Sequence, residues 1–428
     1  MNNSISYIKR AIFNEITKHL DKKEISLIIG PRQVGKTVLL GQLQKYLAEE
    51  KKIPSNAIFS FNLDIIQDRE LFESQTEFIK FIKQRSLNQK IYVFVDEAQK
   101  VKEAGVFFKG AYDSDLPVKL ILTGSSTLEI KSKIFESLTG RKRVFHLFPF
   151  SFLEVLSFKA PELYGLIKKN KKIISYDHKK ILEIFYEYSI FGGYPKAAIT
   201  DNYQEKEAYL KEIFTSYIEK DIIGFLKIES EANFIKLVKL LAAQIGNLIN
   251  ITELSSLINT DRNTVQRYLS VLEKTFVIHN LPPFFTNARQ EIVKNPKIYF
   301  IDNGLRNSGL ETLQKSFQSR EDKGALLENI ILKELLILKY ANNFNIKFWR
   351  SKQKAEVDFI IEKGLDIFPM EIKSNCGGKM EKSLQGFIER YKPKKAFVVN
   401  LDYQGKKTRG ETEVNFIYPY ELTKYLGN

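Results

Sequence analysis

The chain has 428 residues, a length that suits roughly two to four domains, and its hydrophobic (43%) and charged (27%) fractions exclude a wholly disordered or fibrous protein. One cysteine and four histidines argue against a disulfide framework and against a cysteine- or histidine-rich metal centre. The net charge is +15, the apolar runs are too short for a membrane span, and the N-terminus has no signal-peptide pattern, so we expect a soluble, cytoplasmic protein without a membrane partner.

Residues 24–127 alternate short apolar runs with mixed stretches of helical length. The apolar runs are ISLIIG, AIFSFNL, IYVFVDE and VKLILTGSS. Strands that are buried on both faces of a parallel sheet are continuously apolar in this way. The pattern therefore predicts an α/β fold in which helices cover a parallel sheet, and we place this first domain at residues 1–145.

The segment GPRQVGKT, at residues 30–37, matches the phosphate-binding pattern G-x-x-x-x-G-K-[ST] and lies between the run ISLIIG and the amphipathic stretch VLLGQLQKYLAEE. Glycines let such a loop wrap a phosphate, Lys36 places a positive charge on the β- and γ-phosphates, and the Thr37 hydroxyl ligates Mg²⁺. We expect ATP and Mg²⁺ as cofactors. The residues expected to bind the nucleotide are Gly30, Pro31, Arg32, Gln33, Val34, Gly35, Lys36 and Thr37.

Acidic and hydroxyl side chains end two later apolar runs. Asp96 and Glu97 end the run IYVFVDE, at the sheet edge where the phosphate-binding loop is also expected. There Asp96 can hold Mg²⁺ through water, and Glu97 can orient or deprotonate an attacking water. Thr123, Ser125 and Ser126 end the run VKLILTGSS, where they either contact the γ-phosphate or form an ordinary turn or helix cap.

The middle of the chain is lysine- and aromatic-rich and mostly helical in pattern, which we assign to a helical lid or linker at residues 146–235. Residues 251–283 then predict a helix capped by Thr252, a tight turn, a second helix and a strand, the pattern of a winged helix-turn-helix at residues 236–300. The exposed face of the second helix either enters the major groove of DNA or contacts another protein. The residues on that face are Arg262, Asn263, Gln266 and Arg267.

Residues 301–428 contain a helical stretch, GALLENIILKELLILKY, followed by the strand-like runs NIKFW, EVDFIIE, FPMEIKS and KKAFVVN. Glu328 lies on the helix and Asp358 in the second run, whereas Glu371 and Lys373 share one face of the third run because they are two positions apart. This set resembles the restriction-endonuclease-like site, in which carboxylates such as Asp358 and Glu371 bind Mg²⁺ and the lysine orients the hydrolytic water. Such folds can also bind nucleic acid without cutting it.

Taken in order, GPRQVGKT, VFVDEAQ, LILTGSS and SLTGRKRVFHLFPFSFLEVL resemble the prokaryotic AAA-type P-loop ATPases that carry an uncharacterised C-terminal domain. FGGYPKAAIT and KIYFIDNGLRN resemble segments in the second half of that family. The resemblance implies ATP binding and hydrolysis, with residues 30–37 as Walker A and with Asp96 and Glu97 as Walker B. The resemblance further implies that Arg141 acts on the γ-phosphate. In a homo-oligomer, this arginine can act on the nucleotide of a neighbouring subunit. The triplet RKR is equally consistent with a surface basic cluster.

We therefore predict an ATP-hydrolysing enzyme that couples its nucleotide state to DNA binding and carries a nuclease-like α/β domain as a Mg²⁺-dependent tail. An excess of 66 basic over 51 acidic side chains suits a polyanionic partner, although a lysine-rich solvated surface gives the same count. The alternative function is a nucleotide-dependent switch that binds protein and has a non-catalytic tail.

Overall fold

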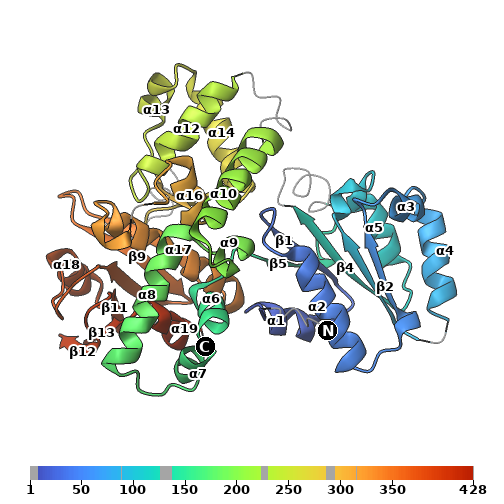
Figure 1. The fold of residues 1–428 in the computed structure, drawn as a ribbon, viewed down its shortest axis with the longest axis horizontal. Coiled ribbons are helices and arrows are strands. Elements are labelled where there is room, and N and C mark those ends of the chain that lie inside the picture. Colours follow the sequence, from blue (N-terminus) through green and yellow to red (C-terminus); the bar gives the residue numbers. More distant parts are fainter. Residues whose placement is uncertain are drawn as a thin grey trace. The chain divides into compact units, whose positions relative to one another are not determined.

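The fold is described from a computed structural model (Figure 1). The structure describes residues 8–87, 89–125, 137–222, 230–285, 295–314 and 316–427. The chain forms two compact units, Met1–Phe148 with Lys274–Phe276, and Pro149–Glu273 with Val277–Asn428. The first boundary lies near the one expected at residue 145, whereas the finer division of the remaining chain stays a prediction. Of the helices described, none combines the length and the apolar composition needed to cross a bilayer.

The first unit alternates strands and helices along the chain. Its strands are β1 (Ile25–Gly30), β2 (Ile58–Asn62), β3 (Ile91–Asp96), β4 (Val118–Ser125) and β5 (Lys142–His146). Its helices are α1 (Phe13–His19), α2 (Lys36–Glu49), α3 (Ile66–Arg69), α4 (Gln75–Arg85) and α5 (Ala104–Asp113), with 3-10 turns at Ser55–Ala57, Glu70–Phe72 and Ala98–Lys100.

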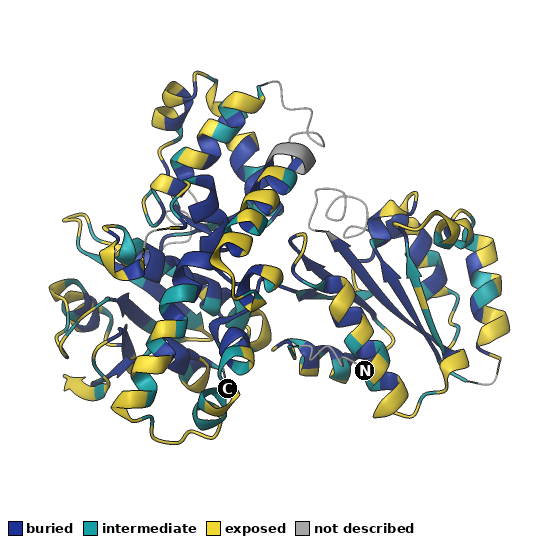
Figure 2. Ribbon diagram, in the orientation of Figure 1, coloured by how far each residue is buried: buried dark blue, intermediate teal, exposed yellow. Residues whose placement is uncertain are grey.

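These strands form one parallel sheet in the order β2-β3-β4-β1-β5. The central strands β1 and β3 are buried along their whole length, as their continuous apolar runs predict (Figure 2). Because the strands are parallel, the loop after β1 and the ends of β3 and β4 lie at one edge of the sheet. The predicted α/β fold with a parallel sheet is confirmed, and it gathers the predicted site residues at that edge.

The second unit begins with helices. They are α6 (Phe152–Lys159), α7 (Pro161–Lys168), α8 (Ser175–Phe191), α9 (Pro195–Ile199), α10 (Tyr203–Ile213), the π-helical stretch Phe214–Ile222, α12 (Glu231–Ala243), α13 (Ile251–Leu257) and α14 (Arg262–Lys274). The antiparallel pair β6 (Ile278–Leu281) and β7 (Lys297–Phe300) follows. The expected helix, turn, helix and strand are present. The expected cap is wrong, because Asn250 rather than Thr252 accepts the hydrogen bond from the Glu253 amide.

One buried aspartate joins two segments of the second unit that lie far apart in the sequence. Asp302 caps α16 (Asn303–Gly309) by accepting hydrogen bonds from the amides of Gly304 and Leu305, and it also accepts from the amide of Gly193. A Cβ added to Gly193 would lie 2.1 Å from the Phe150 carbonyl oxygen, so only glycine fits there. The segments FGGYPKAAIT and KIYFIDNGLRN therefore meet in a structural contact.

The C-terminal part of this unit is built on a mixed sheet in the order β12-β13-β11-β10-β9-β8. Its strands are β8 (Asn345–Arg350), β9 (Glu356–Lys363), β10 (Asp366–Ile372), β11 (Lys395–Val399), β12 (Gly405–Arg409) and β13 (Thr412–Ile417). Its helices are α17 (Lys323–Asn342), α18 (Lys382–Tyr391) and α19 (Leu422–Leu426), with 3-10 turns at Phe317–Ser319 and Pro419–Glu421. The predicted runs match β8 to β11 and α17. β12 is polar and pairs with β13 at the sheet edge, so no apolar run marks it.

Candidate functional site

The loop after β1 has a backbone shape that suits a phosphate. Gly35 is left-handed, with φ +90°, and Gln33 is also left-handed, with φ +60°. Gly30 passes so close to the chain after β5 that an added Cβ would lie 2.0 Å from the Leu147 carbonyl oxygen. α2 begins directly after the loop, at Lys36. The first amides of a helix lack acceptors within the helix and favour an anion, so the loop and α2 together form a potential phosphate site.

Lys36 is buried in this loop, and its charge is held by neutral groups. Its Nζ donates to the carbonyl oxygens of Gly30 at 3.2 Å and Pro31 at 2.9 Å, and the residue is only 6% exposed. Burial lowers the pKa of Lys36 to about 8, against the opposing charges of Glu97 and Asp96. Among the described residues, the hydrogen-bond partners of the Lys36 ammonium are these two carbonyl oxygens. Its positive charge is therefore available to a phosphate.

The ends of β3 and β4 meet the phosphate-binding loop at one carboxylate. Thr37 Oγ1 donates to Asp96 Oδ2 at 2.5 Å, and Thr123 at the end of β4 donates to the other oxygen of Asp96. Hydroxyl and carboxylate oxygens are ligands that Mg²⁺ prefers, so Thr37 and Asp96 fit the predicted metal role. The predicted Ser126 lies outside the described residues, as does the side chain of Ser125.

Glu97 lies in a tight turn directly after β3. Its backbone is left-handed, with φ +56°, and its amide donates to Asp96 Oδ1 at 3.2 Å and Thr123 Oγ1 at 3.3 Å. Its carboxylate accepts a hydrogen bond from Gln99 and lies close enough to raise the pKa of the Lys36 ammonium against the lowering effect of burial. A non-glycine residue in this conformation costs about 1–3 kcal/mol, and such residues cluster at functional sites. Gln99 is a partner that the sequence analysis did not identify.

Arg10 is a second member of this site that the sequence analysis missed. Its guanidinium donates to the carbonyl oxygens of Val34 at 2.8 Å and Phe148 at 2.6 Å, and it is 7% exposed. It therefore ties the phosphate-binding loop to the N-terminal segment and to the chain after β5. No pattern in YIKR distinguishes Arg10 from other basic residues, so the sequence carries no signal for this role.

Arg141 lies at the opposite edge of the sheet from the loop. It precedes β5, whose first residue Lys142 pairs with Ile25 at the start of β1, whereas the loop follows the end of β1, roughly 16 Å further along the strand. Its guanidinium binds both carboxylate oxygens of Asp113, at 2.8 and 3.2 Å, and this hydrogen bonding raises the pKa of Arg141. Within one chain Arg141 is not brought to the phosphate loop, so its phosphate role stays a prediction for a neighbouring copy.

The predicted DNA-facing residues share one exposed face of α14. Its opposite face packs into the unit through Val265, Leu269 and Leu272, all buried. An open hollow at the start of α14 includes Ser255 and Asp261 among its lining residues. The exposed residues are Arg262, Asn263, Gln266 and Arg267. A polar face of this shape suits either DNA or protein.

The structure brings Asp358 and Glu371 together at neighbouring strands. Each lies one position beyond the last paired residues of β9 and β10, Phe359 and Met370. Asp358 Oδ2 accepts from the amide of Ile372 at 2.7 Å. The predicted neighbourhood of a strand aspartate and a strand glutamate is thus present.

The charges in this cluster interact strongly. Lys373 Nζ lies 3.1 Å from Glu371 Oε1, as expected for side chains on one strand face. Burial, followed by the charges of Glu328 and Glu371, raises the pKa of Asp358 well above its usual range. Burial also raises the pKa of Glu371 to about 7, against the lowering effect of Lys373. These carboxyl groups would gain from a cation.

Glu328 approaches this cluster from α17, but its carboxylate already has partners on β7. Its Oε1 accepts a hydrogen bond from the Tyr299 hydroxyl and lies 3.3 Å from Lys297 Nζ, which is also 2.5 Å from Glu356 Oε1. Burial opposes the charge of Lys297, yet Glu328, Asp358 and Glu356 together raise its pKa above the usual range. The sequence analysis missed Lys297 and Tyr299, although their spacing places them on one face of a strand.

One oxygen in the C-terminal cluster supports a metal role. Glu371 Oε2 is buried and accepts no hydrogen bond from any described residue, a state that a cation would relieve. Nowhere in the described chain are three or more His, Cys, Asp or Glu side chains arranged to hold a metal ion. A cation at Glu371 and Asp358 would therefore draw further oxygen ligands from water or from a phosphodiester.

Comparisons with protein families match one domain of known type and two domains of unknown function in the chain. Residues 22–156 match the family model of an AAA domain, and residues 182–316 and 323–422 match two domains of unknown function, DUF8612 and DUF4143. The AAA match contains the phosphate-binding loop, Asp96 and Glu97. This match supports a nucleotide-binding function of the ATPase type.

Similar proteins occur in bacteria and archaea. An uncharacterized protein of Haemophilus influenzae is 25% identical over 365 residues, which cover 84% of each chain. Uncharacterized protein MJ1544 of Methanocaldococcus jannaschii is 26% identical over 82% of this chain and 75% of its own. Among solved structures, C. elegans PCH-2 has a TM-score of 0.29 and 15% identity over 47% of this chain and 56% of its own, and Pif1 helicase from Candida albicans has 0.25 and 12% over 42% and 48%.

Proposed function

We propose that the first unit binds ATP with Mg²⁺ and hydrolyses it. The observation that carries the proposal is Lys36, a buried ammonium held by two carbonyl oxygens beside the contact between Thr37 and Asp96. A cation with neutral partners can move to phosphate oxygens without breaking an ion pair. The neighbouring hydroxyl and carboxylate suit the metal that accompanies those phosphates.

Each residue at the sheet edge has a distinct role in this proposal. The backbone of residues 30–37 wraps the β-phosphate, and Lys36 contacts the β- and γ-phosphates. Thr37 holds Mg²⁺ directly and Asp96 holds it through water. Glu97 orients the attacking water or accepts its proton. Thr123 keeps the Asp96 carboxylate in place through their hydrogen bond.

We further propose that Arg141 acts on the nucleotide of a neighbouring copy. Its position at the opposite sheet edge makes contact with its own nucleotide impossible without large rearrangement. Mixing Arg141→Ala protein with Lys36→Ala protein should then restore part of the ATP turnover that each lacks. Absence of any recovery, together with a monomer under turnover conditions, would refute the intersubunit role.

We also propose that nucleotide state is coupled to DNA binding through the exposed face of α14. Support comes from its arginine, asparagine and glutamine side chains and from the net charge of +15. The test is ATP turnover by the purified full chain, with and without single-stranded, duplex and branched DNA. We expect stimulation by at least one DNA and an affinity that falls as salt rises. A protein that turns over ATP but neither binds nor responds to DNA would instead support the protein-binding switch.

The C-terminal cluster is proposed as a Mg²⁺-dependent phosphodiesterase site, with Asp358 and Glu371 as metal ligands and Lys373 orienting the water. The buried free oxygen of Glu371 supports this role. The pairing of Glu328 with Lys297 favours the rival, a non-catalytic binding fold. Wild type and Asp358→Ala/Glu371→Ala should be incubated with labelled duplex and branched DNA in Mg²⁺ or Mn²⁺, with and without ATP. Cutting by the wild type alone supports the site, whereas no cutting and no calorimetric metal binding support the binding fold.

A further inference from the structure

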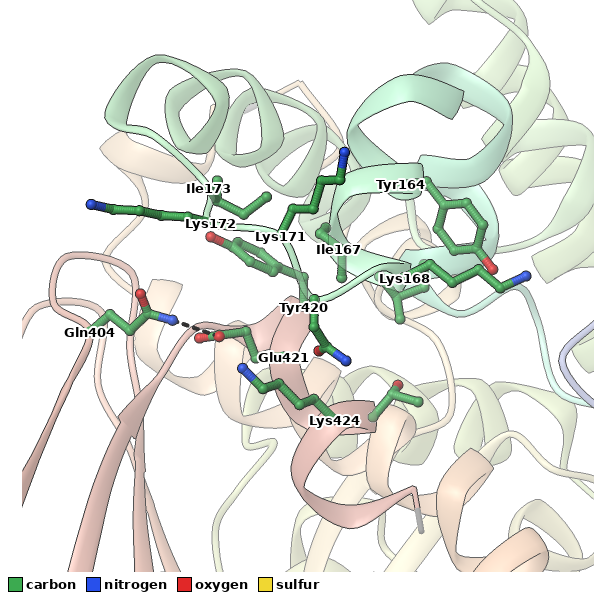
Figure 3. Close-up of a pocket in the computed structure, with 13 residues that line it drawn as sticks. Tyr164, Ile167, Lys168, Lys171, Lys172, Ile173, Gln404, Tyr420, Glu421 and Lys424 are labelled. Carbon is green, nitrogen blue, oxygen red and sulfur yellow. Dashed lines mark hydrogen bonds between the residues drawn. The ribbon is translucent and has the colours of Figure 1, made fainter.

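The second unit contains a cavity of about 530 Å³ that none of the roles above uses (Figure 3). The end of α7 and the turn into α8 form one wall, and the turn Pro419–Glu421 with α19 forms the other. Small-molecule sites have volumes of roughly 300–1,000 Å³. The cavity is therefore large enough for a nucleotide and too small for a duplex.

The inner lining of this cavity is apolar and aromatic. Leu153, Ile167 and Ile173 supply aliphatic side chains, and Tyr164 supplies a half-buried ring, whereas Tyr420 lies buried beneath the lining. Tyr420 is held in place because its hydroxyl pairs with His178, whose other ring nitrogen pairs with the Leu401 carbonyl. A planar, weakly polar group would find both apolar contact and an aromatic ring here.

Lysines surround this apolar lining. Lys168, Lys171, Lys172 and Lys424 come from two separate segments, and Figure 3 shows Lys168 and Lys172 extending in opposite directions. The turn that carries three of them is ordered by a hydrogen bond from the Lys171 amide to the Leu166 carbonyl, at 3.0 Å. Lys168, Lys171 and Lys172 form no ion pair with an acidic side chain within the described ranges, whereas Lys424 lies near enough to Glu421 to lower the pKa of that carboxyl. The charges of the first three lysines are thus available to a ligand.

The acidic residue among the lining side chains does not cancel this charge. Glu421 Oε1 accepts a hydrogen bond from Gln404 at 2.6 Å, as Figure 3 shows, and its Oε2 accepts from the Tyr418 amide at 2.9 Å. Burial raises the pKa of Glu421, against the lowering effects of the Tyr418 amide and of Lys424. The carboxyl group of Glu421 is used in hydrogen bonds that hold the turn Pro419–Glu421. The lining still has more lysines than acidic residues.

We propose that this cavity binds a phosphorylated nucleotide, with the base against the aliphatic side chains and Tyr164 and the phosphates on lysines of its rim, Lys171 and Lys172 among them. Lysine ammonium groups act as point charges that suit phosphates in many orientations, and tyrosine rings accept any base by stacking. The nucleotide is either free or the 5′-phosphorylated end of a nucleic-acid strand. The site lies in a different unit from the phosphate-binding loop and does not depend on ATP hydrolysis.

The test measures binding to full-length protein carrying Lys36→Ala, so that the loop of the first unit contributes least. Fluorescence anisotropy follows a labelled hexadeoxynucleotide with a 5′-phosphate and the same strand without it, and ATP and tripolyphosphate are added as competitors. The cavity variant is Lys171→Glu/Lys172→Glu. The matched control is Lys179→Glu/Lys180→Glu, which makes the same charge change on exposed residues of α8 outside the cavity.

We expect the cavity variant to bind roughly tenfold more weakly or worse and the control to change less than about threefold. ATP should compete better than tripolyphosphate, because the base adds contacts. A preference for the 5′-phosphorylated strand over ATP assigns a strand end, and the reverse order assigns a free nucleotide. Equal losses in both variants, no binding by the Lys36→Ala protein, or equal competition by tripolyphosphate and ATP would overturn the proposal.

Discussion

Lys36 and Lys297 are both buried lysines at candidate phosphate-processing sites, yet their partners differ in charge. Lys36 donates to two backbone carbonyls, whereas Lys297 lies against the carboxylates of Glu328 and Glu356. Burial lowers the pKa of Lys36 to about 8, while the carboxylates overcome burial and raise the pKa of Lys297. Among the described residues, the ammonium of Lys36 has no anionic hydrogen-bond partner, whereas the ammonium of Lys297 already neutralises the carboxylates of Glu328 and Glu356.

The difference shows what burial alone does not reveal. An ammonium with carbonyl partners gains when a phosphate arrives, so its site is built for an anionic ligand. An ammonium between carboxylates neutralises the negative charge that would otherwise attract a divalent cation. The N-terminal site is therefore ready to bind its ligand, whereas the C-terminal cluster must compete with its own lysine for a metal.

The largest expected effect tests the N-terminal half of this comparison. Glu97→Gln should keep ATP binding but slow turnover by about 10²–10⁴-fold, because it removes the group that orients or deprotonates water. Glu103→Gln is the matched control, since Glu103 is exposed and also left-handed, with φ +48°. Steady-state turnover and calorimetric ATP binding provide the measurements. Normal turnover by Glu97→Gln would show that this role belongs to another residue.

Substitution of Lys297 tests whether this lysine acts as the internal cation of the C-terminal cluster. Lys297→Met leaves the half-buried carboxylates of Glu328 and Glu356 without their cation, and because breaking a fully buried pair costs about 3–5 kcal/mol, we expect a destabilisation at or below that range. Mn²⁺ should then restore much of the lost stability, raising the melting temperature of Lys297→Met more than that of wild type or Lys297→Arg. Thermal unfolding with and without Mn²⁺ measures this. A variant as stable as wild type, with no added response to Mn²⁺, would contradict the internal-cation account.

Arg10 offers a smaller test of the phosphate-binding loop. Arg10→Met removes the hydrogen bond to the Val34 carbonyl, and a hydrogen bond to a charged group contributes about 1.5–3 kcal/mol. We expect ATP affinity to fall by about tenfold or more, measured by calorimetry. Lys9→Met, at the exposed neighbouring position, should bind as wild type. Equal affinity for Arg10→Met and Lys9→Met would mean that the loop holds its shape without Arg10.

A third buried lysine sharpens the comparison through pH. Lys119 is fully buried, its Nζ contacts the Glu24 carbonyl and His19 Nδ1, and burial lowers its pKa from 10.5 to about 7. Between these values the unfolded chain binds more protons, so the free energy of unfolding rises with pH by up to about 1.4 kcal/mol per pH unit. Urea unfolding at pH 7 and 9 should show wild type gaining stability relative to Lys119→Met. An unchanged difference would contradict the lowered pKa.

The sequence predicted the first unit well because its signals are local. The apolar runs mark buried parallel strands, and the phosphate-binding pattern lies within the consecutive residues 30–37. Arg10 and Gln99 were missed because their roles depend on contacts across the fold that no spacing encodes. Thr252 was misassigned as a cap because the helix begins at Ile251, two residues earlier than a cap at Thr252 implies.

The C-terminal cluster was predicted in part. Strand alternation and chain order were sufficient to bring Asp358, Glu371 and Lys373 together. The position of Glu328 was also anticipated, but its partners Lys297 and Tyr299 lie in the preceding hairpin. Pairing between distant segments decides whether a carboxylate is free for a metal, and one sequence does not specify that pairing. Polar edge strands such as β12 are missed by sequence-based prediction because they bury too little surface to require apolar residues.

The most direct test compares ATP turnover by Lys36→Ala with turnover by Asp358→Ala/Glu371→Ala. Loss of the Lys36 charge should reduce turnover by at least about a hundredfold, because truncating one partner of a buried charge contact costs several kcal/mol. The double variant should turn over ATP at the wild-type rate, since its residues lie in the other unit. Wild-type turnover by Lys36→Ala would contradict the assignment of the nucleotide site to the N-terminal loop.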